Sequence, residues 1–187
     1  ALGVNVGTAG AFVVNGGALG TPSSGVLTNC TGTATGLTAG ALSTETIARL
    51  GSTFTTASTT LVDVTGMNVA MLANKDYIVE VDVLFQSTQA TTGLWLALNG
   101  PASPTSVSYQ YQIPVSAVAF NARIASAYDA GSASTDVAVA NTTYYVKLFG
   151  IVRNGANAGN LQLRLAAENA NAVSVRTGTR IKLTQTN

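Results

Sequence analysis

Hydrophobic and polar positions alternate along much of the chain from residue 53 onward. The clearest case is YIVEVDVLFQ, residues 77–86, where the odd positions carry only aromatic or branched apolar side chains. The even positions carry Ile78, Glu80, Asp82, Leu84 and Gln86. Because successive side chains of a strand point to opposite faces, this pattern predicts a strand with one buried and one mostly hydrated face.

The same alternation occurs at 161–166, and shorter apolar stretches predict further strands at 94–98, 106–113, 144–152, 172–176 and 180–184. Turn signals separate them: Asn74-Lys75-Asp76, Asn99-Gly100-Pro101, Asn154-Gly155 and Thr177-Gly178. About eight to ten short strands without a convincing long helix are typical of all-β proteins. We therefore expect an antiparallel β-sandwich or jelly roll over residues 53–187.

Residues 1–42 have a different pattern, with recurrent glycine and no charged side chain. Such a segment has too few large side chains to fold alone, yet its apolar residues would be left in water. We expect an extended Gly/Thr-rich stalk that winds around copies of itself; the alternative is an ordered arm on its own domain. The residues expected to form the trimer stalk are Val4, Val6, Phe12, Val13, Val14, Leu19, Val26, Leu27 and Leu37.

A short helical joint is expected at residues 43–52, between stalk and sandwich. The segment STETIARL offers Ser43 or Thr44 as an N-cap. Glu45 near its start and Arg49 near its end suit a helix dipole. This segment can form two turns at most.

Composition narrows the function classes. Only 9% of residues are charged and the net charge is +1, whereas an ordinary soluble domain carries about 25% charged residues. This surface must therefore be covered by Thr, Ser, Asn and Gln, which favours an extracellular or virion location.

No basic cluster is present, so we expect no nucleic-acid partner. No apolar run approaches the roughly 18 residues of a membrane span, so we expect no membrane insertion. The start at Ala1, inside a Gly/Thr pattern, suggests a fragment of a longer chain or a lost initiator Met.

Candidate chemistry is sparse. The chain has no His, which removes Ser-His-Asp and Cys-His arrangements and the commonest metal ligand. Glu80 and Asp82 share a strand face, as paired carboxylates for glycoside hydrolysis would, but a solvated strand face has the same pattern. We expect no catalytic residue, no metal and no cofactor. Cys30 is the single cysteine and is expected to be a small buried apolar residue.

Tyr109 and Tyr111 lie two residues apart and so share one face of a predicted strand, with Gln110 between them. These three residues are the candidate ligand-binding set, because exposed rings with a neighbouring amide suit a carbohydrate surface. Packing in the core or between subunits is the other interpretation of the two rings.

Two segments resemble proteins of tailed bacteriophages. GALGTPSSGVLTNCTG (17–32), after ALGVNVGTAGAFVVNGG, resembles a segment of tail-fibre and other phage structural proteins. Residues 53–187 resemble a phage domain with an "NGPA" turn after an Ala/Thr-Thr-Gly strand. Asn99-Gly100-Pro101-Ala102 and Thr91-Thr92-Gly93 carry that match, and the two patterns together span almost the whole chain.

The resemblance implies a virion protein, commonly trimeric, on a tail fibre or a capsid fibre, and it supplies no catalytic residues. We therefore expect a non-enzymatic homotrimeric appendage on the virion surface, a tail fibre or fibre tip that contacts the host. Its expected partners are itself, other virion proteins through the N-terminal segment, and a host surface glycan. The alternative is a capsid decoration or head-fibre (cement) protein, and a remote alternative is a carboxylate-based polysaccharide depolymerase.

Overall fold

A computed structural model describes residues 45–187, so every residue of the predicted stalk lies outside the described residues. The described range contains no helix, and hence none long and apolar enough to cross a membrane. Its eleven strands are β1 (Glu45–Arg49), β2 (Phe54–Thr56), β3 (Val62–Met71), β4 (Asp76–Ser87), β5 (Leu94–Asn99), β6 (Ser106–Pro114), β7 (Phe120–Ala125), β8 (Tyr144–Arg153), β9 (Gly159–Ala167), β10 (Val173–Val175) and β11 (Arg180–Gln185). The expected all-β fold class is thereby confirmed.

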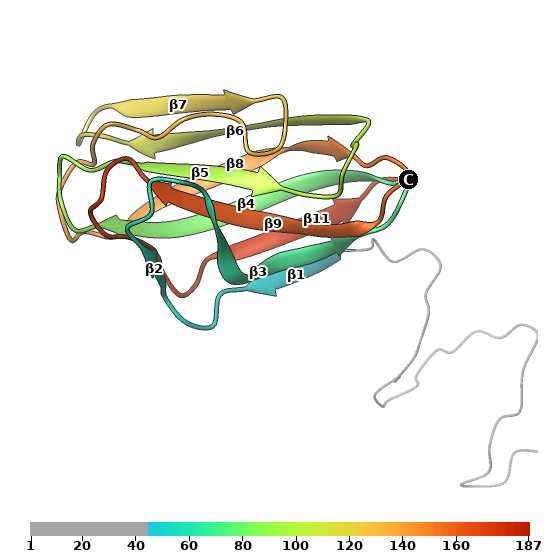
Figure 1. Cartoon of the computed structure of the whole chain (residues 1–187), viewed down its shortest axis with the longest axis horizontal. Helices are drawn as coiled ribbons and strands as arrows, with labels where there is room; N and C mark the ends of the chain where they lie inside the picture. Colours follow the sequence, from blue (N-terminus) through green and yellow to red (C-terminus); the bar gives the residue numbers. More distant parts are fainter. Residues whose placement is uncertain (1–44) are drawn as a thin grey trace, which may run out of the picture. The chain divides into compact units, whose positions relative to one another are not determined.

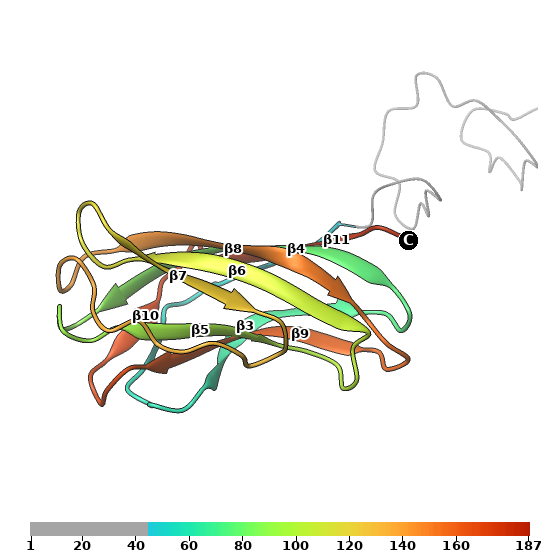
Figure 2. The same cartoon turned by 90° about the horizontal axis from the view of Figure 1, so that it is seen from above.

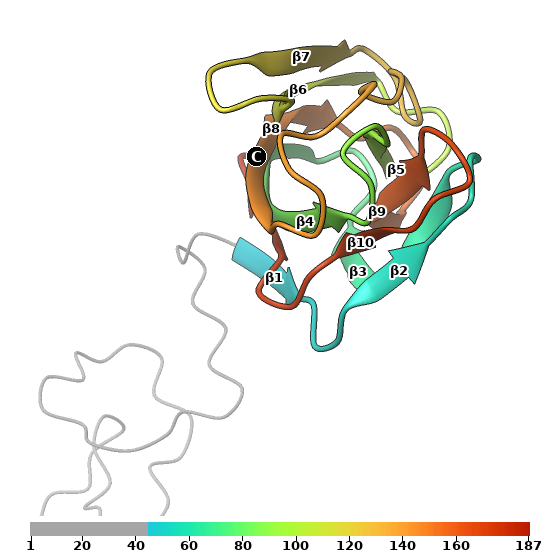
Figure 3. The ribbon, with the colours of Figure 1, turned by 90° about the vertical axis from the view of Figure 1, so that its left-hand side faces the viewer.

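The strands form two antiparallel sheets that pack as layers (Figures 1 and 2). The larger sheet has eight strands, with the main order β1-β11-β4-β8-β6-β7. β10 pairs with the end of β4 and also with β2. The smaller sheet has the order β3-β9-β5. Viewed nearly along the strands, the larger sheet curves around the smaller one (Figure 3).

The core lies between the two sheets and follows the alternation of the sequence. On β4, the side chains of Tyr77, Val79, Val81, Val83 and Phe85 are all buried. They face the leucines of the smaller sheet, Leu94, Leu96 and Leu98 from β5 and Leu161, Leu163 and Leu165 from β9, in one continuous cluster. Packing the two apolar faces together is what holds the sheets as a sandwich.

A bulge in β3 keeps that strand facing the core. Its pairing with β9 shifts register between Asp63 and Asn68, and Gly66 lies in the left-handed region at φ +81°. Between these two pairs β3 advances five residues while β9 advances two, so β3 carries three extra residues, and both Val64 and Met67 point inward although their spacing is odd. Strict alternation would have exposed one of the two.

The predicted helical joint is wrong for the residues that the structure describes. Glu45–Arg49 forms β1, an edge strand that pairs with β11 and belongs to the sandwich. A two-turn helix has little stability of its own, because the nucleation cost is spread over few hydrogen bonds. Pairing with β11, and a 2.8 Å ion pair between Glu45 and Lys182, stabilise the extended form instead.

Candidate functional site

The two candidate tyrosines do not line an external surface. Tyr109 and Tyr111 on β6 are 2% and 1% exposed and point into the core. The Tyr109 hydroxyl accepts a hydrogen bond from the Leu98 amide and donates one to the Ala130 carbonyl oxygen, both at 3.4 Å. Burial raises the pKa of Tyr109 to about 12. The prediction that these rings bind a ligand is wrong, and the core-packing interpretation is correct.

The sequence contained a signal for this outcome. Val107 and Ile113 have the same parity as the two tyrosines, and both are buried with them. The opposite parity carries Ser108, Gln110 and Gln112, which are exposed. An apolar residue on each side of the pair therefore indicated the inner face.

Gln110 is the one member of the predicted ligand set on the surface, and it leads to the outer face of the larger sheet. In the pairing register it lies opposite Phe149 of β8 on one side and Ile124 of β7 on the other. Phe149 is in turn opposite Glu80 of β4. This row of side chains crosses four strands on the side of the sheet away from the core.

Around this row the outer face carries an apolar patch, which we define as Ile78, Ile124, Phe149 and Ile151. Their exposed fractions run from 44% for Ile78 and Phe149 to 78% for Ile124. Ile78 and Ile151 are direct cross-strand partners, two residues along each strand from the pair of Glu80 and Phe149. Sequence reasoning missed this patch because it depends on pairing between strands that are not consecutive in the chain.

The patch lines a shallow hollow of about 590 Å³. Gly150 lies at its base, where β6 and β8 approach closely: a Cβ atom there would be 2.1 Å from the Ser108 carbonyl oxygen. A second hollow of about 350 Å³ adjoins the first and is lined by Phe120 and Tyr145, which are also exposed. The outer face thus carries exposed apolar side chains around two hollows that another molecule could fill.

The carboxylate pair lies beside the patch and is occupied by basic partners. Glu80 accepts from Lys147 at 2.6 Å, and this contact holds the pKa of Glu80 below its usual value. Burial would raise the pKa of Asp82, but hydrogen bonds from Tyr145 and Arg180, both 2.6 Å, outweigh it and lower the pKa. A general acid in glycoside hydrolysis needs a raised pKa, so this arrangement favours ion pairing over acid catalysis.

A second charged cluster holds the smaller sheet to a loop. Arg164 of β9 contacts Asp63 at 2.9 Å and Asp129 at 2.7 Å, and Asp129 also accepts from the Asn99 side chain at 2.6 Å. The arrangement ties residue 129 to the outer side of β5 and β9. Within residues 45–187, no group of three or more acidic or cysteine side chains could hold a metal ion.

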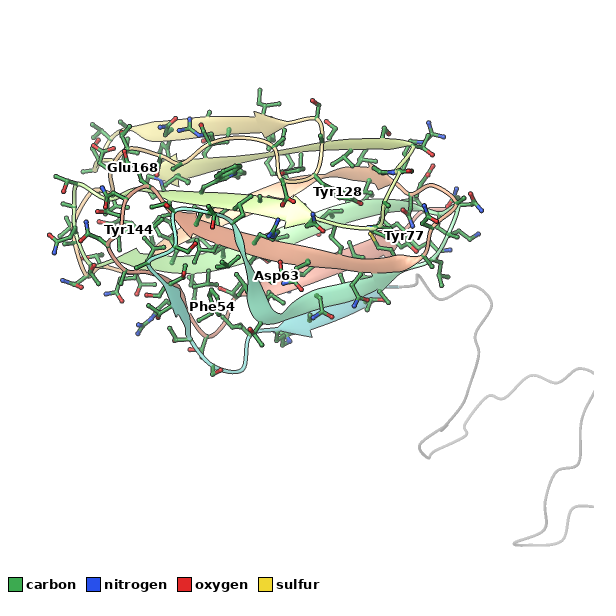
Figure 4. All side chains as sticks on the ribbon, viewed as in Figure 1. Phe54, Asp63, Tyr77, Tyr128, Tyr144 and Glu168 are labelled. Atoms are coloured by element: carbon green, nitrogen blue, oxygen red, sulfur yellow. The ribbon has the colours of Figure 1, made fainter. Side chains whose placement is uncertain are left out.

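The "NGPA" turn connects loops at one end of the sandwich, the end that also carries the C-terminus (Figure 1). The Asn157 side chain donates to the Ala102 carbonyl oxygen at 2.9 Å. Gly100 lies against the ring of Tyr128, which is labelled near this end in Figure 4. The motif that carries the phage resemblance therefore has a structural role in the described part of the chain.

Asn154 holds the same end together from the β8–β9 turn. Its side chain is buried and donates to the carbonyl oxygens of Leu72 at 2.8 Å and Asn157 at 2.9 Å. Its backbone amide donates to the Lys75 carbonyl oxygen at 2.9 Å. One side chain thus links the β3–β4 and β8–β9 turns.

Comparison with known proteins gives only distant structural similarity. No protein-family model and no curated protein sequence matches the chain. The tripod from the baseplate of bacteriophage Tuc2009 aligns with 97% of this chain and 83% of its own, at 13% identity and a TM-score of 0.30. A structure of infectious bursal disease virus, Gx strain, aligns with 76% of this chain and 39% of its own, at 11% identity and a TM-score of 0.25. The VP2 subviral particle of that virus aligns with 75% and 37%, at 7% identity and a TM-score of 0.21.

Proposed function

We propose that the chain is a non-enzymatic structural subunit of a phage virion appendage. The virion assignment rests on the resemblance of residues 17–32 and of the "NGPA" segment to phage structural proteins. The geometric observation that supports a structural role is the apolar patch on the outer face of the larger sheet. A broad apolar face around a shallow hollow suits contact with another macromolecule. The two charged side chains that line the hollow, Glu80 and Lys147, are paired with each other.

The subunit assembles as a homotrimer in this proposal. Three copies around an axis can bury apolar surface with no open end, whereas a non-closing contact would produce filaments. Residues 1–42 would form the stalk of the trimer and contact other virion proteins. We expect a mass of three chains in solution at micromolar concentration, measured by light scattering, and a monomer would contradict this part of the proposal.

In this proposal the appendage also contacts the host surface, but none of the described residues is assigned to a ligand site. Two of the three residues expected to bind a glycan, Tyr109 and Tyr111, are buried, and Gln110 alone does not define a sugar site. No described residue therefore distinguishes a tail-fibre role from a capsid role. The two roles are distinguished by the position of the protein on the virion.

The position is tested by labelling intact virions of the encoding phage with gold-conjugated antibody against residues 53–187. Label at the tail supports an appendage that meets the host. Label spread over the capsid, with copies in the hundreds, identifies a decoration or head-fibre protein instead. Virions that bind no antibody, while the purified chain does, would overturn the virion assignment.

The non-enzymatic part has a separate test. We expect the purified full chain to release no reducing ends from host surface polysaccharide. Release that is abolished by Glu80→Gln and Asp82→Asn would overturn this part and assign a depolymerase. Matched control substitutions at Glu168 and Asp136 would show that the loss is specific to the pair.

A further inference from the structure

We infer that the apolar patch of Ile78, Ile124, Phe149 and Ile151 is the surface on which a second copy of this chain packs. This inference rests on the proposed self-assembly and names the part of the sandwich that carries it.

The side chains of the patch favour a protein partner. Three of the four are branched aliphatic residues, and Ile78 and Ile151 are paired directly across neighbouring strands. Monomeric proteins rarely expose a continuous group of large apolar side chains without a contact to cover it. A sugar would present hydroxyl groups that need polar partners, and isoleucine offers none.

The charges around the patch are already neutralised within the chain. Glu45 pairs with Lys182, Glu80 with Lys147 and Lys182, Asp82 with Arg180, and Asp76 with Arg153. Each acidic side chain on the outer faces of β1 and β4 therefore has a basic partner of its own. A strongly charged partner would find few free counter-charges here, whereas copies of the chain that meet around the trimer axis bring equally neutral faces and equal apolar patches.

The size and layout of the face fit a stable interface. The six strands β1, β11, β4, β8, β6 and β7 present roughly two dozen outward side chains, and a standard interface uses about 20–30 residues on each side. The apolar side chains of the patch come from β4, β8 and β7, with the polar Gln110 of β6 between Phe149 and Ile124. The ion pairs that border them join β4 to β8 and to β11. Charged side chains at the border of an apolar group are common in protein interfaces.

The test measures whether the patch is covered when the chain self-associates. In the full chain with Cys30→Ser, a single thiol is placed by Ile151→Cys or, as a control, by Val139→Cys. The two sites have nearly equal exposure in one copy, 54% and 57%, but Val139 lies in the loop between β7 and β8. The maleimide labelling rate and the molar mass are recorded over the same range of protein concentrations.

We expect the thiol at position 151 to react at least tenfold more slowly than the control in the assembled protein, and to recover on dilution as the mass falls. Equal rates in an assembled protein would overturn the inference and leave the proposed trimer intact. A monomeric chain would overturn both. Slow labelling that persists in monomers would show that position 151 is covered within a single copy, which also overturns the inference.

A second pair of variants tests the energy of the contact. Phe149→Asp with Ile151→Asp should weaken self-association at least 100-fold, because two charges would be buried at the centre of the interface. Leu72→Asp with Val139→Asp, also exposed positions, should leave the association constant unchanged. Equal association by both double variants, with circular dichroism spectra like that of the parent chain, would contradict the inference.

Discussion

A Cβ atom on Gly100 would lie 2.3 Å from both Cζ and Oη of Tyr128. No side chain fits there unless the tyrosine ring moves. We expect Gly100→Ala to lower the free energy of unfolding by about 1–3 kcal/mol, as overpacking does in cores. Chemical denaturation of the full chain measures the change.

The matched control for this prediction is Gly51→Ala. A Cβ atom at Gly51 would meet nothing within 4 Å, so the substitution should be neutral or slightly stabilising. Equal effects at the two glycines would show that Tyr128 does not hold the "NGPA" turn.

The two buried tyrosines of β6 should respond differently to loss of their hydroxyls. Tyr109→Phe removes the bonds to Leu98 and Ala130 and should cost about 1 kcal/mol of stability. The Tyr111 hydroxyl has no hydrogen-bond partner among the described residues, so Tyr111→Phe should be neutral or stabilising. Thermal unfolding of both variants measures the difference, and a larger loss at Tyr111 would point to a buried partner such as a water molecule.

Acid should destabilise the sandwich through the carboxylates beside the patch. The pKa values of Glu80 and Asp82 are lowered in the folded chain from the ordinary 4.5 and 3.8. Their contribution to stability is therefore present above those ordinary values and lost as the pH falls through the lower, folded-state values. We expect Tm to fall from about pH 4.5 downward.

The variant Asp82→Asn isolates this contribution. It should lower Tm at neutral pH, because the charged contacts of the carboxylate with Arg180 and Tyr145 are lost. It should also flatten the dependence of Tm on pH below 4, because the amide has no carboxylate to be protonated there. Asp136→Asn, on a loop outside the outer face, is the control. Parallel curves for Asp82→Asn and the parent chain would refute the assignment.

Asn154 should be a sensitive position for stability. Asn154→Ala leaves the carbonyl oxygens of Leu72 and Asn157 without their donor, which should cost about 2–4 kcal/mol. Asn160→Ala, at an exposed site on β9, should change stability by less than about 0.5 kcal/mol. Urea denaturation compares the two variants, and similar midpoints would contradict the role given to the Asn154 amide.

The sequence was most informative where alternation persisted over many residues. Five inward positions on β4 were predicted and all five are buried, since a long run of period two has no competing interpretation. It was misleading at Glu45–Arg49, where helix-capping residues lie in a segment whose conformation is decided by a strand far along the chain.

β7 was not among the predicted strands, because its large apolar side chains face outward rather than toward the core. Phe120 and Ile124 face outward, and Arg123 on the other face donates to the carbonyl oxygens of Ser132 and Ala133. The outer apolar patch could not be predicted for a related reason. It joins β4, β8, β6 and β7, and only the sheet order brings those strands together.

The pairing of β1 with β11 also affects how the chain can fold during synthesis. Ile47 has Lys182 as its Cα partner, so a ribosome must deliver nearly the whole described chain before β1 can join the sheet. Contacts between such distant residues make folding slow, because a long loop must close before any contact stabilises it. Completion of the larger sheet is therefore a late step in folding, and the growing chain must avoid aggregation until β11 emerges.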